Sequence, residues 1–406
     1  MKKTTSAVAA LLLTTTAASA AGIERGNNDY SVLFEDGNYA KLSYSTVRPS
    51  VSGDYGAVFG PFAGTSTGTM SEDYSSIGAS LKYGITPDLD IALFLNQPFG
   101  ANALYPDGPY SGLGAQWDSN QVALVLKYQA TPNISVYGGV RSIESNATIA
   151  IPDTLVRGGL ARGAQAAVAA ATASGNPTAI AQANGALAGV VGAPAGAFAY
   201  DAKARADRQT SYIAGAAYEM PEIALRVALT YESGYTHSFD TTETVLASPA
   251  TSGDSTTEIE MPQSVTLDFQ SGVAANTLVF GSIKWSEWSV WEVRPAGYEA
   301  LTRGQRVTGI DNDTFTYRLG VGRQFTDELS GFARVTYEAS NGDPASRLAP
   351  TDGSTAIGIG GTYSFDDIEV TAGVEYVMLG DATDDSGTEF ADNSAIGVGI
   401  SIGYSF

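Results

Sequence analysis

Residues 396–406, at the end of the chain, alternate strictly between apolar and very small side chains. Ile, Val, Tyr or Phe occupies every even position from 396 to 406, and Gly or Ser occupies every odd position between them. Successive side chains of a β-strand point to opposite faces, so the segment predicts a strand with one apolar face and one face that takes up little space. A strand of this kind that ends on Phe is typical of bacterial outer-membrane barrels. The alternative is an edge strand of a soluble sandwich, which rarely ends on an aromatic residue.

The same alternation recurs along the chain. Apolar rows at every second position begin at Ile77, Leu89, Val122, Ile223, Val265, Phe315, Ile357 and Ile368. Six short turns lie near 86–88, 131–133, 219–222, 273–276, 326–328 and 365–367. Seven longer segments lie near 49–71, 99–116, 149–209, 233–258, 289–312, 340–353 and 379–393. Six turns alternating with seven loops predict an all-β fold: a 14-stranded antiparallel transmembrane β-barrel over residues 39–406, closed so that no strand edge faces lipid.

The composition excludes several classes of protein. Only 16 % of the residues are charged and the formal net charge is −21, which argues against a nucleic-acid partner. The chain has no cysteine and one histidine, His237, so thiolate sites, zinc clusters and histidine-based triads are not expected. We therefore predict no catalytic residue, no metal site and no cofactor, and a role in structure or transport.

The N-terminus carries the features of an export signal. Lys2 and Lys3 precede a short apolar stretch from Ala7 to Leu13, and Ala18, Ser19 and Ala20 provide small residues for cleavage. Residues 1–21 are therefore predicted to be a signal peptide. A membrane anchor is the alternative, but the apolar stretch is far too short to span a bilayer. Together with the barrel, the signal predicts the outer membrane of a Gram-negative bacterium.

Residues 22–38 precede the first predicted strand on the inner side of the membrane. The segment mixes apolar and polar side chains, among them Tyr30, Leu33 and Phe34. We predict that it folds into the lumen as a partial stopper, and we refer to it as a hatch. A disordered tail is the alternative, because chain termini often fray.

The loop 149–209 is predicted to be helical and extracellular. Residues 163–200 contain no charged side chain and are dominated by alanine and other small residues. Two helices are expected, the first capped by Asp153 and ended by Gly175, and the second capped by Asn176 with Pro177 at its first position. Their apolar faces would pack on other loops or meet a hydrophobic ligand.

Several cations point into the lumen if the alternation is followed: Arg226, Arg318 and Arg334, with Lys284 and Arg141 as further candidates. Phe332 lies on the same face as Arg334 and adds an apolar lumen surface. A cation beside apolar surface suits a carboxylate with a hydrocarbon tail. The alternative is that these cations pair with acids of the wall, such as Glu222, Asp268, Glu338 and Glu375.

The third predicted strand is interrupted at Gln97-Pro98-Phe99-Gly100. Proline donates no hydrogen bond to a sheet, and glycine weakens a strand further. In a closed barrel the pair would kink the wall and open it sideways towards lipid. The alternative, which composition alone favours, is that the strand ends at Asn96.

Three segments resemble one known family. Gln97 to Ala101, Tyr218 to Arg226 and Trp285 to Ser289 are similar to the outer-membrane long-chain fatty acid transporter family, which is FadL-like and includes uptake channels for aromatic hydrocarbons. Met261 to Ser264 and Tyr317 to Gly322 match as well. The resemblance implies a fourteen-stranded barrel with an N-terminal hatch, an external helical loop that captures ligand, and a kink in the third strand that releases it laterally. The Asn-Pro-Ala box usual in the family's hatch is absent here.

The leading hypothesis is therefore passive transport of hydrophobic compounds, above all long-chain fatty acids, with outer-membrane lipid and lipopolysaccharide as surroundings and the monomer as functional unit. One alternative is a porin for small polar solutes. The other is a phospholipase, which would use His237 and Ser238, but neighbours on a strand point to opposite faces.

Overall fold

The wall of the molecule is one closed β-sheet. The computed structural model describes residues 23–26, 28–245, 252–340, 342 and 345–406, so the predicted signal peptide lies outside the described residues. The wall strands are β1 (Tyr39–Ser50), β2 (Tyr74–Thr86), β3 (Leu89–Asn96), β4 (Gly100–Leu104), β5 (Gly114–Thr131), β6 (Ile134–Ile151), β7 (Tyr200–Met220), β8 (Leu225–Glu232), β9 (Tyr235–Val245), β10 (Gly253–Met261), β11 (Ser264–Ala274), β12 (Thr277–Ser286), β15 (Thr314–Gln324), β16 (Leu329–Glu338), β17 (Ser354–Phe365), β18 (Ile368–Leu379) and β21 (Ser394–Ser405). Three pairs, β3 with β4, β8 with β9 and β10 with β11, each follow one course across the wall, which gives the predicted 14-stranded antiparallel barrel.

The first and last strands close the barrel. β1 pairs with β21 in an antiparallel register that runs from Tyr39 opposite Ser405 to Ser50 opposite Ser394. Closure pairs the backbone groups of both edges, which in hydrocarbon would each cost several kcal/mol if left unpaired. The seam therefore follows directly from the alternating C-terminal segment.

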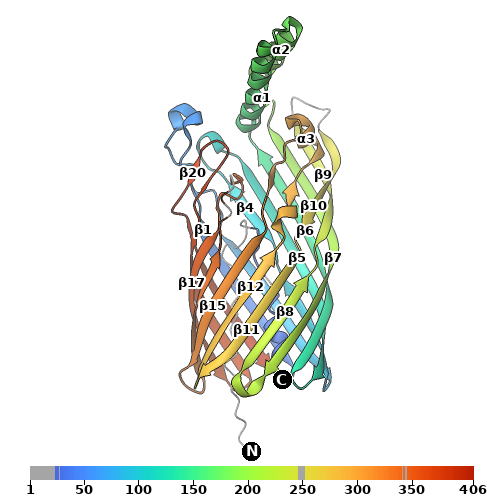
Figure 1. Cartoon of the computed structure of the whole chain (residues 1–406), viewed down its shortest axis with the longest axis vertical. Helices are drawn as coiled ribbons and strands as arrows, with labels where there is room; N and C mark the ends of the chain where they lie inside the picture. The colour runs from blue at the N-terminus through green and yellow to red at the C-terminus, as the bar shows by residue number, and fades with distance from the viewer. Residues whose placement is uncertain (1–22, 27, 246–251, 341, 343–344) are drawn as a thin grey trace, which may run out of the picture.

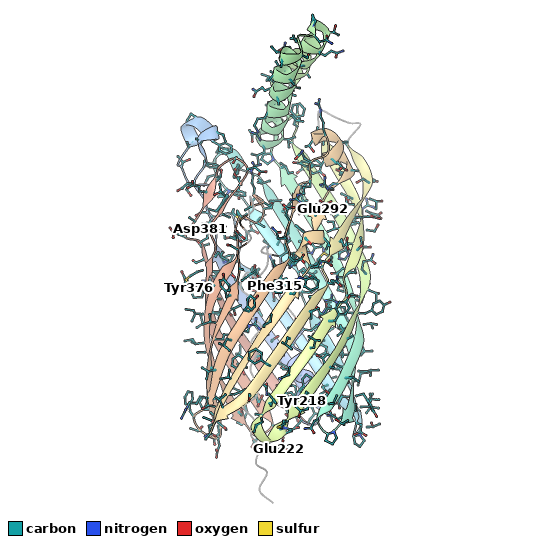
Figure 2. All side chains as sticks on the ribbon, in the orientation of Figure 1. Tyr218, Glu222, Glu292, Phe315, Tyr376 and Asp381 are labelled. Atoms are coloured by element: carbon teal, nitrogen blue, oxygen red, sulfur yellow. The ribbon has the colours of Figure 1, made fainter. Side chains whose placement is uncertain are left out.

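The alternation separates the two faces of the wall as predicted. On β21 the even-numbered residues are exposed on the outside, Ile400 by 44 % and Ile402 by 47 %, whereas Ser401 is 4 % exposed. Figure 2 shows Tyr218, Phe315 and Tyr376 on the same outer surface. The barrel thus presents apolar and aromatic side chains to the bilayer and small or polar ones to the lumen.

All six predicted short turns are present at one end of the barrel, where the C-terminus lies, and the loops extend from the other end (Figure 1). The loops hold the two-stranded sheets β13 (Glu292–Val293) with β14 (Thr308–Gly309) and β19 (Ala382–Thr383) with β20 (Glu389–Phe390). Residues 233–258 were predicted to be a loop, and this is wrong because β9 and β10 continue the wall outwards as a hairpin. Their Thr, Ser, Asp and Glu side chains hide the strands from a search for apolar rows.

The helices lie mainly in the outer loops. They are α1 (Asp153–Ser174), α2 (Pro177–Gly192), α3 (Ala296–Thr302) and the short 3₁₀ turns η1 (Tyr30–Phe34), η2 (Ala57–Phe62), η3 (Gly108–Tyr110), η4 (Pro221–Ile223) and η6 (Trp288–Val290). None of the described helices is long and apolar enough to cross a membrane.

The α1–α2 hairpin stands well above the barrel (Figure 1). It fills residues 153–192 of the predicted loop, because β6 and β7 reach further out than expected. Gly175 ends α1 in the left-handed conformation, and the Asn176 side chain caps α2, both as predicted. Asp153 is not the cap of α1; it lies in the first turn and forms an ion pair with Arg157.

An arginine placed at Ile400 should destabilise the barrel by about 2–4 kcal/mol, because a charge would then face the bilayer interior from the middle of β21. Ile396→Arg, near the outer end of the same strand, should cost about 0–1 kcal/mol. Urea unfolding in phospholipid vesicles measures both. Equal costs would contradict the depth that we assign to β21.

Candidate functional site

The hatch segment, defined here as residues 23–26 and 28–38, packs against the inner wall of the barrel. Leu33 is fully buried, and the Tyr30 ring lies 5.6 Å from that of Phe94 on β3. The ring of Phe34 is covered by two inward cations, Lys127 at 4.8 Å and Arg226 at 4.6 Å. The three predicted hatch residues thus lie together within the lumen.

Charged contacts hold the hatch segment to three sides of the wall. Asp29 forms an ion pair with Lys41 on β1 at 2.6 Å, and Glu24 forms one with Lys284 on β12 at 2.7 Å. The hydroxyl of Tyr30 donates a hydrogen bond of 2.5 Å to Glu232, at the end of β8. Release of the segment would separate these partners and leave buried charges unpaired, which is unfavourable. The contacts therefore hold the segment in place.

The wall is incomplete where β3 is interrupted. β2 pairs with β3 only as far as Ala79 opposite Leu95, and β4 continues the course by pairing with β5. The part of β2 from Tyr74 to Gly78 is paired with β1 alone. A stretch of wall between β2 and β4 therefore lacks the hydrogen-bonded ladder found on either side.

The predicted kink residues partly compensate for this missing ladder. The carbonyl of Pro98 accepts hydrogen bonds from the backbone of Arg25 (2.9 Å) and Gly26, and the backbone N–H of Gly100 donates to Ile23 (2.8 Å). The Gln97 side chain accepts a long hydrogen bond, 3.4 Å, from the backbone of Ile77 on β2. The hatch segment thus takes the place of β2 as neighbour of the third strand, but from inside the barrel.

Phe99 is the apolar member of the kink. Its side chain is buried, and its ring meets that of Trp288 edge to face at 6.0 Å. Both its backbone groups bond to the Ser119 hydroxyl of β5, the N–H as donor and the carbonyl as acceptor. At the break, both backbone groups of Phe99, the carbonyl of Pro98 and the N–H of Gly100 therefore have individual partners.

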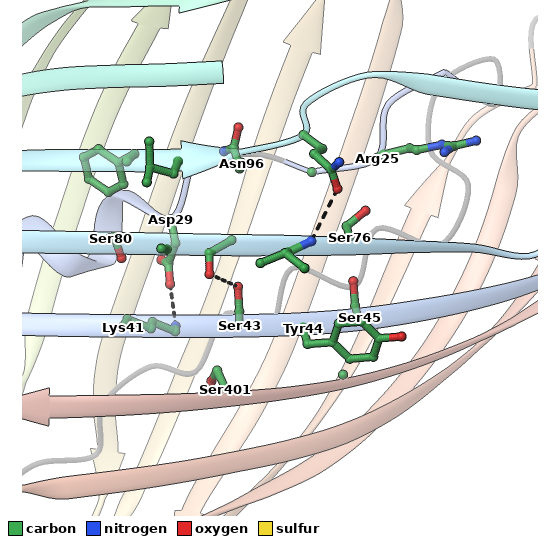
Figure 3. Close-up of a pocket in the computed structure, with 18 of the residues that line it drawn as sticks. Arg25, Asp29, Lys41, Ser43, Tyr44, Ser45, Ser76, Ser80, Asn96 and Ser401 are labelled. Carbon is green, nitrogen blue, oxygen red and sulfur yellow. Dashed lines mark hydrogen bonds and ion pairs between the residues drawn. The ribbon is translucent and has the colours of Figure 1, made fainter. Parts of the chain in front are cut away.

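A cleft lies in the wall at this point, and we call it the wall opening (Figure 3). Its lining includes inward-facing residues of β1 and β2, such as Ser43 and Ser76, and outward-facing ones, such as Tyr44, Ile77 and Leu95. Residues from both faces of the sheet therefore contribute to the lining of the wall opening. It is narrow, with about 70 Å³ of free space.

An apolar pocket, the inner pocket, lies in the lumen on the outer side of the hatch segment. Its lining contains no ionisable side chain and includes Trp117, Ile259, Trp291 and Val293 from the wall and loops. Ile23 of the hatch segment completes it. The free space is only about 70 Å³, so a ligand would have to displace side chains in order to bind there.

A larger pocket, the outer pocket, lies among the loops under helix α1. It has about 610 Å³ of free space, and Leu155, Val156 and Leu160 give it an apolar side. Three arginines also line it: Arg303, Arg306 and Arg347. Thr308 and Leu348 line both this pocket and the inner one, so the two spaces adjoin.

Comparison with known proteins identifies the family of the chain. The family model "Outer membrane protein transport protein (OMPP1/FadL/TodX)" matches residues 84–406. The chain belongs to this family. Its members are outer-membrane transporters of hydrophobic compounds in Gram-negative bacteria, and they are transport channels rather than enzymes.

Solved structures share the fold at low identity. A FadL homologue of Pseudomonas aeruginosa is 14 % identical with a TM-score of 0.67, over 94 % of this chain and 93 % of that one. The P. putida toluene transporter TodX is 15 % identical with a TM-score of 0.63, over 94 % and 93 %. The CymD monoaromatic hydrocarbon channel is 14 % identical with a TM-score of 0.55, over 93 % and 90 %. No curated protein matches the sequence.

Three of the five predicted inward cations of this FadL-like chain form ion pairs: Arg141 with Glu232 (2.8 Å), Lys284 with Glu24 (2.7 Å) and Arg334 with Glu375. Two of these carboxylates, Glu232 and Glu24, also anchor or belong to the hatch segment. None of the five cations lines the outer or the inner pocket. These three contacts are therefore of the kind given by the alternative interpretation, in which inward cations pair with acidic side chains of the protein.

The other two predicted cations differ. Arg226 donates a hydrogen bond of 3.0 Å to Gln270 in addition to covering Phe34. Arg318 forms no hydrogen bond or ion pair with any described residue, and its Nε is buried. Phe332 lies inside the wall, where its ring covers Gly360 at a distance that leaves no space for a Cβ atom.

The sequence did not indicate the arginines that line the outer pocket and the wall opening. Arg303, Arg306 and Arg347 lie in long loops, where no periodicity predicts a direction for a side chain. Arg25 lies outside the motifs, and only the fold brings it to the third strand. His237, considered for catalysis, is buried with its Nδ1 at 2.8 Å from Asp207, while Ser238 is exposed on the opposite face.

Raising the pH should loosen the hatch segment around Glu35. Burial, and secondarily the charge of Glu369, raises the pKa of Glu35 from 4.5 to about 7. The seated segment therefore keeps a proton that the released segment loses, so its stability is full below pH 4.5 and declines as the pH rises to about 7. Hydrogen exchange of residues 30–36, corrected for intrinsic rates, should show the decline.

Glu35→Gln should remove this pH dependence, whereas Asp36→Asn, at the exposed neighbouring position, should retain it. An unchanged pH profile in Glu35→Gln would show that another group controls the seating of the hatch.

Proposed function

We propose that this chain takes up long-chain fatty acids by way of the outer pocket, the inner pocket and the wall opening, in that order. The proposal is carried by two observations: the outer and inner pockets adjoin, and nearby residues of the hatch segment line the inner pocket and the wall opening. The outer and inner pockets share Thr308 and Leu348. Ile23 of the hatch segment lines the inner pocket, and Arg25 and Gly26 of the same segment line the wall opening. One barrel contains the whole path, so a monomer suffices.

The outer pocket suits an amphiphile with a negative head. Leu155, Val156 and Leu160 provide apolar surface for a hydrocarbon chain, and Arg303 provides a cation. Arg306 is engaged with Asp311 at 2.6 Å and Arg347 with Asp384 at 2.9 Å, whereas no described carboxylate pairs with Arg303. A carboxylate ligand would therefore meet an exposed guanidinium that is available for a bidentate bond.

The inner pocket supports a second candidate cargo, neutral aromatic hydrocarbons. Its lining has no ionisable side chain and includes the aromatic rings of Trp117 and Trp291. A carboxylate would lose its hydration there without gaining a partner, so a fatty acid would pass in its protonated form. The monoaromatic channels that share the fold are in keeping with such a cargo.

Arg303→Ala should separate the two cargoes. Oleate binding to the detergent-solubilised protein should weaken about threefold, the size of one exposed ion pair, while toluene binding should not change. Arg162→Ala is the matched control, because Arg162 is exposed on α1 beside the outer pocket but lies outside the pocket lining. Equal loss for oleate and toluene would contradict a head-group role for Arg303.

Closing the wall opening should stop uptake. The chain has no cysteine, so the double variant Ile77→Cys and Gln97→Cys allows β2 to be joined to the third strand by a short reversible thiol cross-linker. These residues lie on the two sides of the wall opening, and the Gln97 side chain already reaches the backbone of Ile77. Uptake of labelled oleate by intact cells should fall on cross-linking and recover on reduction.

Each single-cysteine variant treated in the same way serves as the control and should keep its uptake. Undiminished uptake in the cross-linked double variant would mean that cargo leaves by another route. Liposome swelling by sugars would instead favour the porin alternative.

A further inference from the structure

The side chain of Arg25 lines the wall opening. Its guanidinium lies 4.1 Å from the ring centroid of Tyr74 on β2 and donates a hydrogen bond of 3.3 Å to Asn102 on β4. A Cβ atom at Gly100 would come within 2.6–2.7 Å of the Arg25 side chain. Arg25 therefore joins the two strands that the break in the ladder leaves apart, and Figure 3 shows it beside the opening.

The path of this side chain leads outwards from the lumen. Asn102 is paired with Gln116 of β5, and Gln116 is exposed, whereas the adjacent pair Ala101–Trp117 faces the buried interior. Cross-strand partners share a face, so Asn102 lies on the outer side of the sheet. Arg25 begins in the hatch segment inside the barrel, and its guanidinium reaches a partner on the outside.

The backbone fixes the starting point of the side chain. The Arg25 N–H donates to the carbonyl of Pro98 at 2.9 Å, and Gly100 donates to Ile23 at 2.8 Å. The absence of a side chain at Gly100 is what leaves the guanidinium space to lie flat against the strand. The position of Arg25 thus depends on the kink residues Pro98 and Gly100.

We propose that Arg25 is the gating residue of the wall opening. The inference rests on the proposed exit of cargo through that opening. With Arg25 in place, an apolar ligand would have to pass a charged group with which it forms no favourable contact. Passage therefore requires the guanidinium to leave Tyr74 and Asn102, and the strength of the contacts of Arg25, these two among them, sets how often the opening is clear.

The test is a labelling experiment that does not depend on transport. Ser76→Cys places a single thiol in the lining of the opening, because the chain has no other cysteine. The rate at which a lipid-soluble maleimide labels this thiol in proteoliposomes reports access from the bilayer. Arg25→Ala should raise the rate on the order of tenfold, the combined effect of one cation–π contact and one charged hydrogen bond. Arg25→Lys should fall between, because lysine keeps the charge but loses the planar fork.

Arg48→Ala is the matched control, since Arg48 lies on β1 of the same wall, is exposed, and pairs with Asp73 outside the opening. Its labelling rate should equal that of the parent. An unchanged rate in Arg25→Ala, with the barrel folded by its electrophoretic mobility before and after heating, would overturn the gating role.

Uptake of labelled oleate by the same variants separates the two proposals. Faster labelling with faster uptake supports both of them. Faster labelling with unchanged uptake supports the gate and contradicts the wall opening as the exit. Unchanged labelling overturns the gate whatever the uptake, and leaves the exit to be decided by the cross-linked double variant.

Discussion

The structure depends on the requirement that backbone N–H and C=O groups be paired wherever water is absent. The closed sheet meets this requirement around the barrel, through the seam of β1 with β21 and the ladders between the other strands. Between β2 and β4 the ladder is replaced by individual contacts. The proposed exit of cargo lies at this stretch, where the ladder between neighbouring strands is interrupted.

The replacement contacts come from parts of the chain with different freedom to move. Gln97 belongs to the wall itself, whereas Arg25 belongs to a segment held inside the barrel by ion pairs and buried rings. The hydrogen bonds of a ladder break only when a whole strand moves. A side chain, by contrast, can change its rotamer while the backbone stays in place. This difference lets a rigid barrel have a movable part without loss of its closure.

Much of the fold could be predicted from residues alone, because lipid imposes a strict period of two on side chains. The strand number, the short turns and the outward face of β21 follow from that period. The hairpin of β9 and β10 was missed because it extends beyond the bilayer, where polar side chains such as those of Thr242 and Asp254 are tolerated on the outer face. The alternation of apolar and polar side chains therefore predicts strands only where the wall faces lipid.

The candidate site was less predictable. Alternation assigned Arg141, Arg334 and Lys284 to the lumen, and the alternative of pairing with wall acids named Glu375, the partner of Arg334. It did not name Glu232 and Glu24, the partners of Arg141 and Lys284, which lie 91 and 260 residues away. The pocket arginines Arg303 and Arg347 lie on loops with no period. The face of a strand on which a side chain lies follows from its local position in the sequence. The lining of a pocket, by contrast, comes from segments that are distant in the sequence.

The outward lining of the wall opening, with Ile77 and Leu95, has a thermodynamic consequence. Cargo that leaves between these residues enters the hydrocarbon of the bilayer and not an aqueous compartment. Each methylene group gains about 0.8 kcal/mol on leaving water for such a phase, so the membrane itself acts as the sink. Net inward flow would then continue, without any coupled energy source, for as long as the cell removes the molecules that accumulate there.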